Sequence, residues 1–168
     1  DLIKHSCNDG LMQIGALLGP EEFLKYQKIF NFGATTGIDL PGEATGILHT
    51  EESLSSGSTE LASAVFGQGF TCTMLQEINA MCSVVNGGYY YQPHVVSKIL
   101  NEDGDVIKDV QPVVTKQTVS SDVSALIRQY MGTVMESDGT VAAAKVDGYS
   151  MGGKTGTAQK VQDGRYMS

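Results

Sequence analysis

The sequence reads Gly152-Gly153-Lys154-Thr155-Gly156-Thr157-Ala158-Gln159 near its end, and the interpretation of the whole chain starts there. The residues from Lys154 to Val161 predict a β-strand that begins with the Lys-Thr-Gly motif. Glycine lets a ligand approach the backbone, and a strand edge offers N–H and C=O groups to an extended peptide. The lysine adds positive charge, and the threonine hydroxyls can bind a carboxylate. Alone, the tripeptide is equally typical of a solvated lysine at the start of a strand.

A second motif, Ser6-Cys7-Asn8, lies near the other end of the chain, just before a predicted helix. Serine and asparagine are common helix-capping residues, so the motif by itself indicates a cap. In a chain that also has a Lys-Thr-Gly motif, a second interpretation is possible, because the two motifs can belong to one active site. We therefore expect Ser6 and Lys154 to lie within side-chain reach of each other.

The spacing of apolar residues predicts several helices, and the first two are separated by Gly19-Pro20 because glycine ends helices and proline opens them. Between Ala34 and Ser58 no periodicity is sustained, which predicts a long ordered loop. The predicted helices cover residues 8–18, 21–30, 60–66, 73–86 and 121–134.

The clearest helix begins at Thr73, which has capping-box spacing to Gln76, and ends at Gly87-Gly88. Its buried face is expected to hold Leu75, Ile78, Cys82 and Val85. Further along, the turn residues Asn101–Gly104 predict a hairpin. Its strands would lie within His94–Leu100 and Asp105–Val110, and a second turn at residues 162–164 leads into a strand from Arg165.

Composition excludes several classes of function. The chain has 168 residues with 11 Lys and Arg against 19 Asp and Glu, so its net charge is −8. An acidic chain without a basic cluster is not expected to bind nucleic acid. The 3 cysteines lack zinc spacing and give no disulfide framework. The histidines His5, His49 and His94 show no ligand spacing either, so no metal site and no cofactor are expected.

Several further stretches complete a pattern that spans the chain. They are Phe32–Glu43 with Gly46, Phe66–Gly69 leading to Thr73–Gln76, Asn86–Gly88 with Pro93, and Gly152–Gln159. Ser-x-Asn and Lys-Thr-Gly, with Ser-x-x-Lys, are the motifs of class A β-lactamases and penicillin-binding proteins. With these stretches in order, the chain resembles the transpeptidase domain of class B penicillin-binding proteins, the division and sporulation peptidoglycan transpeptidases.

The resemblance implies a serine acyl-transfer mechanism and a set of site residues. The implied catalytic residues are Ser6, Asn8 and Lys154, and the implied substrate-binding residues are Thr155, Gly156 and Thr157. Ser6 would pass a proton to the leaving amine, Asn8 would donate its amide to the substrate, and Lys154 would supply positive charge and orient Ser6. The two threonines would bind the terminal carboxylate, with the Thr157 backbone as an oxyanion donor.

The resemblance also implies a fold, partners and a location. The fold is α/β of the α+β type, the serine β-lactamase and D,D-transpeptidase-like fold, here mainly helical with a small hairpin and the Lys-Thr-Gly strand. Expected partners are peptidoglycan stem peptides ending in D-Ala-D-Ala, β-lactams and a membrane glycosyltransferase. The expected location is the extracytoplasmic face of the bacterial membrane, with an N-terminal anchor outside these residues.

One family motif is missing. None of the serines has a lysine three residues later, so Ser-x-x-Lys, which carries the nucleophile, is absent. Residues 1–168 are therefore expected to be part of a penicillin-binding transpeptidase domain, incomplete at both ends and inactive alone. Two alternatives stay open: a serine β-lactamase or D,D-carboxypeptidase, and a non-catalytic β-lactam-sensing or interaction domain.

Overall fold

The computed structural model describes residues 1–158, 160–162 and 165–167, which form two compact units. The first unit, called unit 1, comprises Asp1–Tyr26, Leu48–Thr71 and the described residues from Leu126 onward. The second, unit 2, comprises Gln27–Ile47 and Cys72–Ala125. Ser6 and Lys154 both belong to unit 1.

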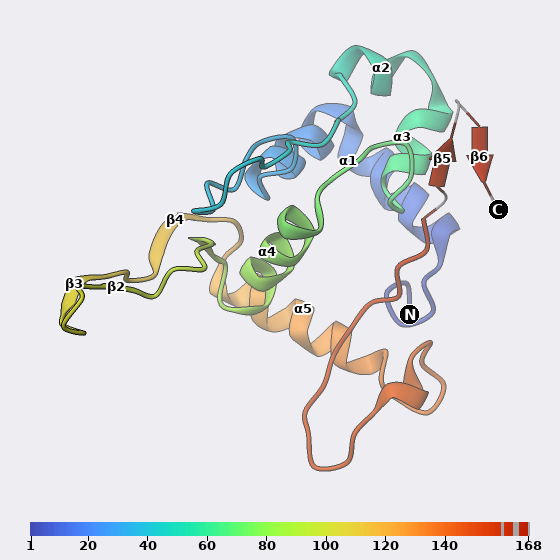
Figure 1. Cartoon of the computed structure of the whole chain (residues 1–168). Helices are drawn as coiled ribbons and strands as arrows, with labels where there is room; N and C mark the ends of the chain where they lie inside the picture. Colours follow the sequence, from blue (N-terminus) through green and yellow to red (C-terminus); the bar gives the residue numbers. More distant parts are fainter. Residues whose placement is uncertain (159, 163–164, 168) are drawn as a thin grey trace. The chain divides into compact units, whose positions relative to one another are not determined.

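In the described residues, helices dominate, and three separate pairs of short antiparallel strands accompany them (Figure 1). The helices are α1 (Asn8–Ile29), α2 (Glu51–Ser56), α3 (Ser58–Ala64), α4 (Met74–Val85) and α5 (Ser121–Thr133), with a 3₁₀ turn at Ala142–Ala144. The strands are β1 (Tyr89–Gln92), β2 (Lys98–Leu100), β3 (Val106–Asp109), β4 (Val113–Gln117), β5 (Lys160–Gln162) and β6 (Arg165–Met167). In the described part of the chain, no helix is long and apolar enough to cross a membrane.

Helix α1 is two helices joined at a sharp kink, as the glycine–proline pair predicts. Gly19 has φ 79° and ψ 163°, and Pro20 follows inside the continuous helical span. A φ in this left-handed region suits glycine, which has no Cβ to clash with the backbone. The predicted break is therefore confirmed.

The prediction of a loop from Ala34 to Ser58 is wrong near its end, because α2 forms there. Thr50 caps this helix, and its hydroxyl accepts a hydrogen bond from the Ser53 amide at 3.1 Å. Leu54 is only 2% exposed and packs with Leu24 and Ala64 in the core of unit 1. Burial of one leucine, rather than any repeat in the sequence, stabilises this short helix.

The predicted hairpin is confirmed, since β2 pairs antiparallel with β3. The pairing of β1 with β4 was not predicted, because three consecutive tyrosines in β1 show no alternation and their partner strand lies beyond the hairpin. The strand expected from Lys154 to Val161 is also wrong in its first part. Residues 154–158 are irregular, and β5 begins only at Lys160, where it pairs with β6. A strand needs a hydrogen-bonded neighbour, and among the described residues none pairs with 154–158.

Helix α4 has the predicted capping box and the predicted end. The Thr73 hydroxyl accepts from the Gln76 amide at 3.1 Å, and the Gln76 side chain accepts from the Thr73 amide at 2.9 Å. Gly87 and Gly88 follow the helix with φ of 101° and 96°. A Cβ at Gly88 would overlap the carbonyl oxygen of Val119, so only glycine fits there.

The buried face of α4 differs from the predicted one. Ile78 is 61% exposed and Cys82 is exposed, whereas Gln76 and Ser83 are fully buried. The cause is a polar interior in unit 2: the Thr118 hydroxyl lies 2.9 Å from the Ser83 hydroxyl. Apolar periodicity predicts the face that meets an apolar core, and it fails where the core is hydrogen-bonded.

Gln76 and Glu43 organise the loop that precedes α2. The Gln76 amide donates to the carbonyls of Ala34 at 2.6 Å and Thr45 at 2.8 Å. The Glu43 carboxylate accepts from the amides of Thr36 at 2.6 Å and Gly37 at 3.1 Å. Burial alone would raise the pKa of Glu43, but these hydrogen bonds outweigh it and hold the pKa below its ordinary value.

Asp39 ties the same loop to the segment before β2. Its carboxylate accepts hydrogen bonds from the amides of Val95 at 2.8 Å and Val96 at 3.0 Å. These bonds hold the pKa of Asp39 below its ordinary value. Since the folded-state pKa is lowered, the stabilisation is full above the unfolded-state pKa of about 3.9 and is lost as pH falls through the folded-state value.

We therefore expect acid to release this tie. Amide exchange at Val95 and Val96, corrected for the intrinsic rate, should lose protection as the pH falls below about 4. Asp39→Ala should remove the same protection already at neutral pH, while Glu102→Gln, an exposed carboxylate in the hairpin turn, should not. Protection that is unaffected by Asp39→Ala would contradict the assignment.

Candidate active site

The two sequence motifs meet in unit 1. The Lys154 ammonium donates a hydrogen bond to the Ser6 hydroxyl at 2.7 Å, although the two residues are 148 positions apart. The expected proximity is therefore confirmed. The same ammonium also donates to the carbonyl of Thr155 at 3.0 Å and lies 3.2 Å from the Thr155 hydroxyl. One charge thus reaches two hydroxyls that the sequence assigns to different roles.

Ser6 lies in a tight turn that folds back on the start of α1. The Cys7 amide donates to the Leu2 carbonyl at 3.1 Å, and the Leu2 side chain fills the space that a Cβ at Gly10 would need. Ser6 itself has φ 52°, a left-handed conformation that is uncommon outside glycine. Residues in such conformations cluster at functional sites, where the surrounding structure holds them in place. The turn is what directs the hydroxyl toward Lys154.

Lys154 is positioned by the two glycines before it. The Gly153 amide donates to the Met131 carbonyl at 3.2 Å, near the end of α5. Gly152 lies so close to this helix that a Cβ would stand 3.2 Å from the Met131 carbonyl carbon. The segment therefore rests on α5 just before the lysine. Partial burial lowers the pKa of the Lys154 ammonium from its ordinary value.

Gln68 is a member of the site whose function the sequence did not indicate. Its side-chain amide donates to the Thr157 carbonyl at 3.3 Å, from a loop after α3. The flanking Gly67 and Gly69 have φ of 95° and 81°, so the backbone turns sharply on both sides of the glutamine. The available signal was the Gly-Gln-Gly sequence itself: two glycines around one polar residue indicate a constrained turn that presents a side chain.

The remaining predicted site residues are placed by the backbone. Asn8 is the first residue of α1, two positions after Ser6, and its side chain is exposed. Gly156 and Thr157 are also exposed. A Cβ at Gly153 or Gly156 would meet no atom within 4 Å, so there is open space beside the Lys-Thr-Gly backbone. An extended ligand can approach this backbone without displacing a side chain.

The geometry can carry a proton and bind a carboxylate. A lysine ammonium in contact with a serine hydroxyl polarises it and can exchange a proton through it. The same positive charge beside threonine hydroxyls attracts an anionic group. A nucleophilic serine needs a neutral base within hydrogen-bond reach, whereas lysine in its charged form donates to the Ser6 hydroxyl. The pair therefore fits an auxiliary part of an acyl-transfer site.

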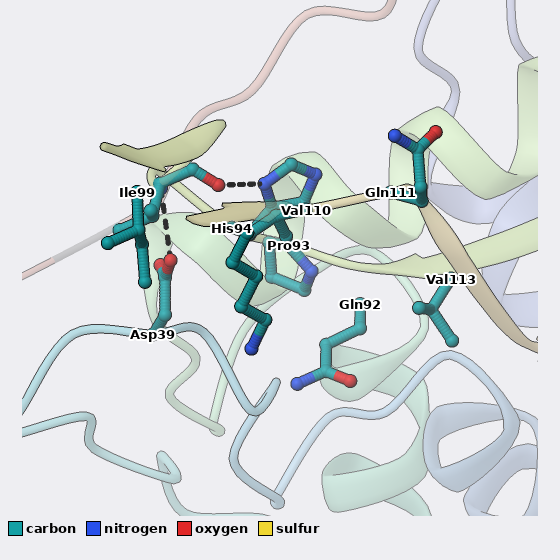
Figure 2. A pocket seen from close by; sticks show the side chains of 10 residues that line it. Asp39, Gln92, Pro93, His94, Ile99, Val110, Gln111 and Val113 are labelled. Atoms are coloured by element: carbon teal, nitrogen blue, oxygen red, sulfur yellow. Dashed lines mark hydrogen bonds between the residues drawn. The ribbon is translucent and has the colours of Figure 1, made fainter. Parts of the chain in front are cut away.

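A separate pocket of about 290 Å³ lies in unit 2, beside the hairpin (Figure 2). Three of its polar residues hold its own wall: Asp39 accepts from two backbone amides, the Gln92 amide donates to the Gly37 carbonyl at 2.6 Å, and His94 Nδ1 lies 2.9 Å from the Val96 carbonyl oxygen. The pocket is lined by Asp39, Gln92, Pro93, His94, Val96, Ile99, Lys108, Val110, Gln111 and Val113. Asp39, Gln92 and His94 thus stabilise the wall of the pocket and are distinct from the motif residues that meet at Lys154.

Comparison with known proteins bears on this site. The chain matches the penicillin-binding protein transpeptidase domain over residues 1–168. It is 42% identical over 168 residues to the stage V sporulation protein D of Bacillus subtilis, a match that covers 99% of this chain and 26% of that protein.

Solved structures give the same result. The chain superposes with a TM-score of 0.86 and 29% identity on penicillin-binding protein 3 of Mycobacterium tuberculosis complexed with aztreonam, covering 99% of this chain and 38% of that one. The D,D-transpeptidase domain of a peptidoglycan glycosyltransferase from Eggerthella lenta matches with a TM-score of 0.86 and 26% identity, over 95% of this chain and 41% of that one. The expected α+β transpeptidase fold is thereby confirmed. The chain spans about a quarter of the Bacillus protein's length.

Proposed function

We propose, from the premise that this chain belongs to the penicillin-binding protein transpeptidase family, that it forms part of a peptidoglycan D,D-transpeptidase. The chain would contribute two of the three active-site motifs. The Ser-x-x-Lys motif with the nucleophilic serine would lie elsewhere in a longer protein, here called the full-length protein. In support, residues 1–168 contain no Ser-x-x-Lys and match only part of the length of their relatives.

The observation that carries the proposal is the 2.7 Å hydrogen bond between Lys154 and Ser6. Either motif alone has an ordinary explanation, as a helix cap or as a solvated lysine. A contact between side chains 148 positions apart is not explained by either. It is expected if both motifs line one cleft and act on one substrate.

In the proposed reaction, the nucleophilic serine attacks the carbonyl carbon between the two terminal D-alanines of a stem peptide. The C–N bond breaks, the terminal D-alanine leaves with a proton, and an acyl-enzyme ester remains. The amine of a neighbouring stem peptide then attacks the ester, forming the cross-link and returning the serine. Penicillin would form an analogous ester when the serine attacks its β-lactam carbonyl: the ring C–N bond breaks, and the nitrogen takes the proton but stays attached to the acyl group.

Each residue of this chain has a place in that scheme. Ser6 would deliver the proton to the leaving amine, and Lys154 would orient Ser6 and supply the positive charge. Asn8 would donate its amide to the substrate backbone. Thr155 and Thr157 would bind the terminal carboxylate, and the Thr157 amide would serve as one oxyanion donor. Gly156 would leave room for the substrate next to the backbone, in keeping with the open space around it.

The cellular setting follows from the same proposal. A sporulation role is favoured over a division role by the 42% identity to the stage V sporulation protein D. The full-length protein would act on the extracytoplasmic face of the membrane, held by an N-terminal anchor, with a membrane glycosyltransferase supplying glycan strands. No cofactor or metal is assigned a role.

The test is product analysis with the full-length protein. A stem peptide ending in D-Ala-D-Ala and an amine-bearing acceptor should yield a cross-linked peptide and one free D-alanine per link, by mass spectrometry. Penicillin should give a long-lived covalent adduct. Rapid penicillin hydrolysis would identify a β-lactamase instead, and D-alanine release without cross-linking would identify a carboxypeptidase. The absence of every one of these reactions would favour a sensing or interaction domain.

A further inference from the structure

We propose that Lys4 is a positioning residue of the transpeptidase site: an ion cluster with Glu136 and Asp138 fixes the turn that directs Ser6 toward Lys154. The inference rests on the proposed function, because positioning matters only if Ser6 and Lys154 act together. Lys4 lies two residues before Ser6 in sequence, outside both motifs.

The ion cluster is close and shielded on the lysine side. The Lys4 ammonium lies 2.6 Å from a carboxylate oxygen of Glu136 and 2.6 Å from one of Asp138. The Lys4 side chain is only 12% exposed. Hydrogen bonds to Asp138 and then to Glu136 raise the pKa of Lys4 above its ordinary value, which is already well above neutral, so the ammonium is charged at neutral pH. A shielded lysine with two carboxylates restrains the chain more than an exposed pair does.

The turn at residues 136–140, which carries both carboxylates, also binds the backbone of Lys4. The Thr140 hydroxyl donates to the Lys4 carbonyl at 3.2 Å, so the ammonium and the backbone are both held. The turn is closely packed: the Gly139 amide donates to the Glu136 carbonyl at 2.8 Å, and a Cβ at Gly139 would overlap the carbonyl of Val134. Lys4 is therefore held at both its side chain and its backbone by the same turn.

The same part of the chain holds Lys154. The turn follows directly on α5, where Val134 is fully buried. Two residues before the end of α5, the Met131 carbonyl accepts from the Gly153 amide at 3.2 Å. The segment from Met131 to Thr140 thus contacts the Ser6 turn through Lys4 and the Lys154 segment through Gly153. It sets the distance between the two motifs.

Ser6 needs such support because its own backbone conformation is unfavourable. A non-glycine residue at φ 52° relaxes to another conformation unless its neighbours prevent it. Within the turn, the Ser6 amide donates to the Ile3 carbonyl at a long distance of 3.4 Å. The ion cluster at Lys4 restrains the N-terminal side of the turn, and Lys154 restrains its hydroxyl. Loss of the first restraint is expected to disturb the second.

The experiment compares acylation of full-length variants by penicillin. Lys4→Met should lower the acylation rate constant roughly ten- to hundredfold, the effect of a displacement of about 1 Å in a reacting group, with the noncovalent dissociation constant little changed. Lys4→Arg, which keeps the charge, should restore most of the rate. Lys25→Met is the matched control, because Lys25 forms an exposed ion pair with Glu22 at 2.8 Å in the same unit; it should leave the rate unchanged.

A mutant cycle separates positioning from stability. In a Ser6→Ala background, Lys4→Met should have no further effect on the rate, because its action passes through Ser6. An equal effect in both backgrounds, or a lowered melting temperature with an unchanged rate, would overturn the inference. If Lys4→Met does not fold, the double variant Glu136→Gln with Asp138→Asn replaces it, under the same expectation. A wild-type protein that penicillin does not acylate would instead refute the proposed function.

Discussion

The full-length protein with Lys154→Ala should be acylated by penicillin about 10²–10³-fold more slowly than the wild type. Removal of one electrostatic contributor to an oxyanion site has an effect of this size, because it costs about 2.7–4 kcal/mol of transition-state stabilisation. The Lys154 ammonium touches the Ser6 hydroxyl at 2.7 Å and the Thr155 carbonyl at 3.0 Å. Its removal takes the positive charge from the substrate carboxylate and leaves Ser6 without the partner that orients it. Stopped-flow or intact-mass measurement of adduct formation gives the rate.

A control and a pH profile make this result specific. Lys145→Ala removes an exposed lysine from the same unit and should leave acylation unchanged. Partial burial lowers the pKa of Lys154, so the wild-type rate should fall at an alkaline pH below the pKa of a free lysine. The Lys154→Ala variant should lack that alkaline limb. An unchanged acylation rate in this variant would mean that Lys154 is a solvated residue with no part in the reaction.

Local signals in the sequence predicted those features that depend on a few neighbouring residues. Gly19-Pro20 predicted the kink, Thr73 with Gln76 predicted the capping box, and Asn101–Gly104 predicted the hairpin turn. Each rests on the backbone preference or hydrogen bonding of residues within a few positions. The Ser6–Lys154 contact was predicted differently, since it needed the order of several motifs along the whole chain and the family resemblance that they established.

Features that depend on distant partners could not be predicted in this way. The buried face of α4 is set by Thr118, a hydrogen-bond partner of Ser83 that lies well beyond the helix in sequence. Residues 154–158 had the composition of a strand, yet strand formation needs a neighbour that composition does not reveal. Lys4 carries no motif, and the Gly-Gln-Gly sequence around Gln68 does not name a partner, so only the fold places them against Glu136 and Thr157.

The 168-residue chain on its own should form no covalent adduct with penicillin. This experiment distinguishes most directly between an auxiliary role for Ser6 and a role as the nucleophile. Acylation needs a serine whose proton a nearby base removes, because a free hydroxyl is a poor nucleophile at neutral pH. In the proposed family mechanism that base is the lysine of Ser-x-x-Lys, and no serine of this chain has a lysine at that spacing.

Among the serines that the structure describes, Ser6 is the one that could be taken for a nucleophile, because its hydroxyl contacts a lysine. However, the proposed scheme uses Lys154 as the charged partner that orients Ser6 and attracts the substrate carboxylate, and its contacts with the Ser6 hydroxyl and the Thr155 carbonyl fit that role. The carboxylate pocket could then retain penicillin only reversibly. Intact-mass spectrometry after incubation with penicillin measures this directly, with the acylated full-length protein as the positive control. A stoichiometric adduct on Ser6 would reverse the assignment, making Ser6 the nucleophile and Lys154 its base.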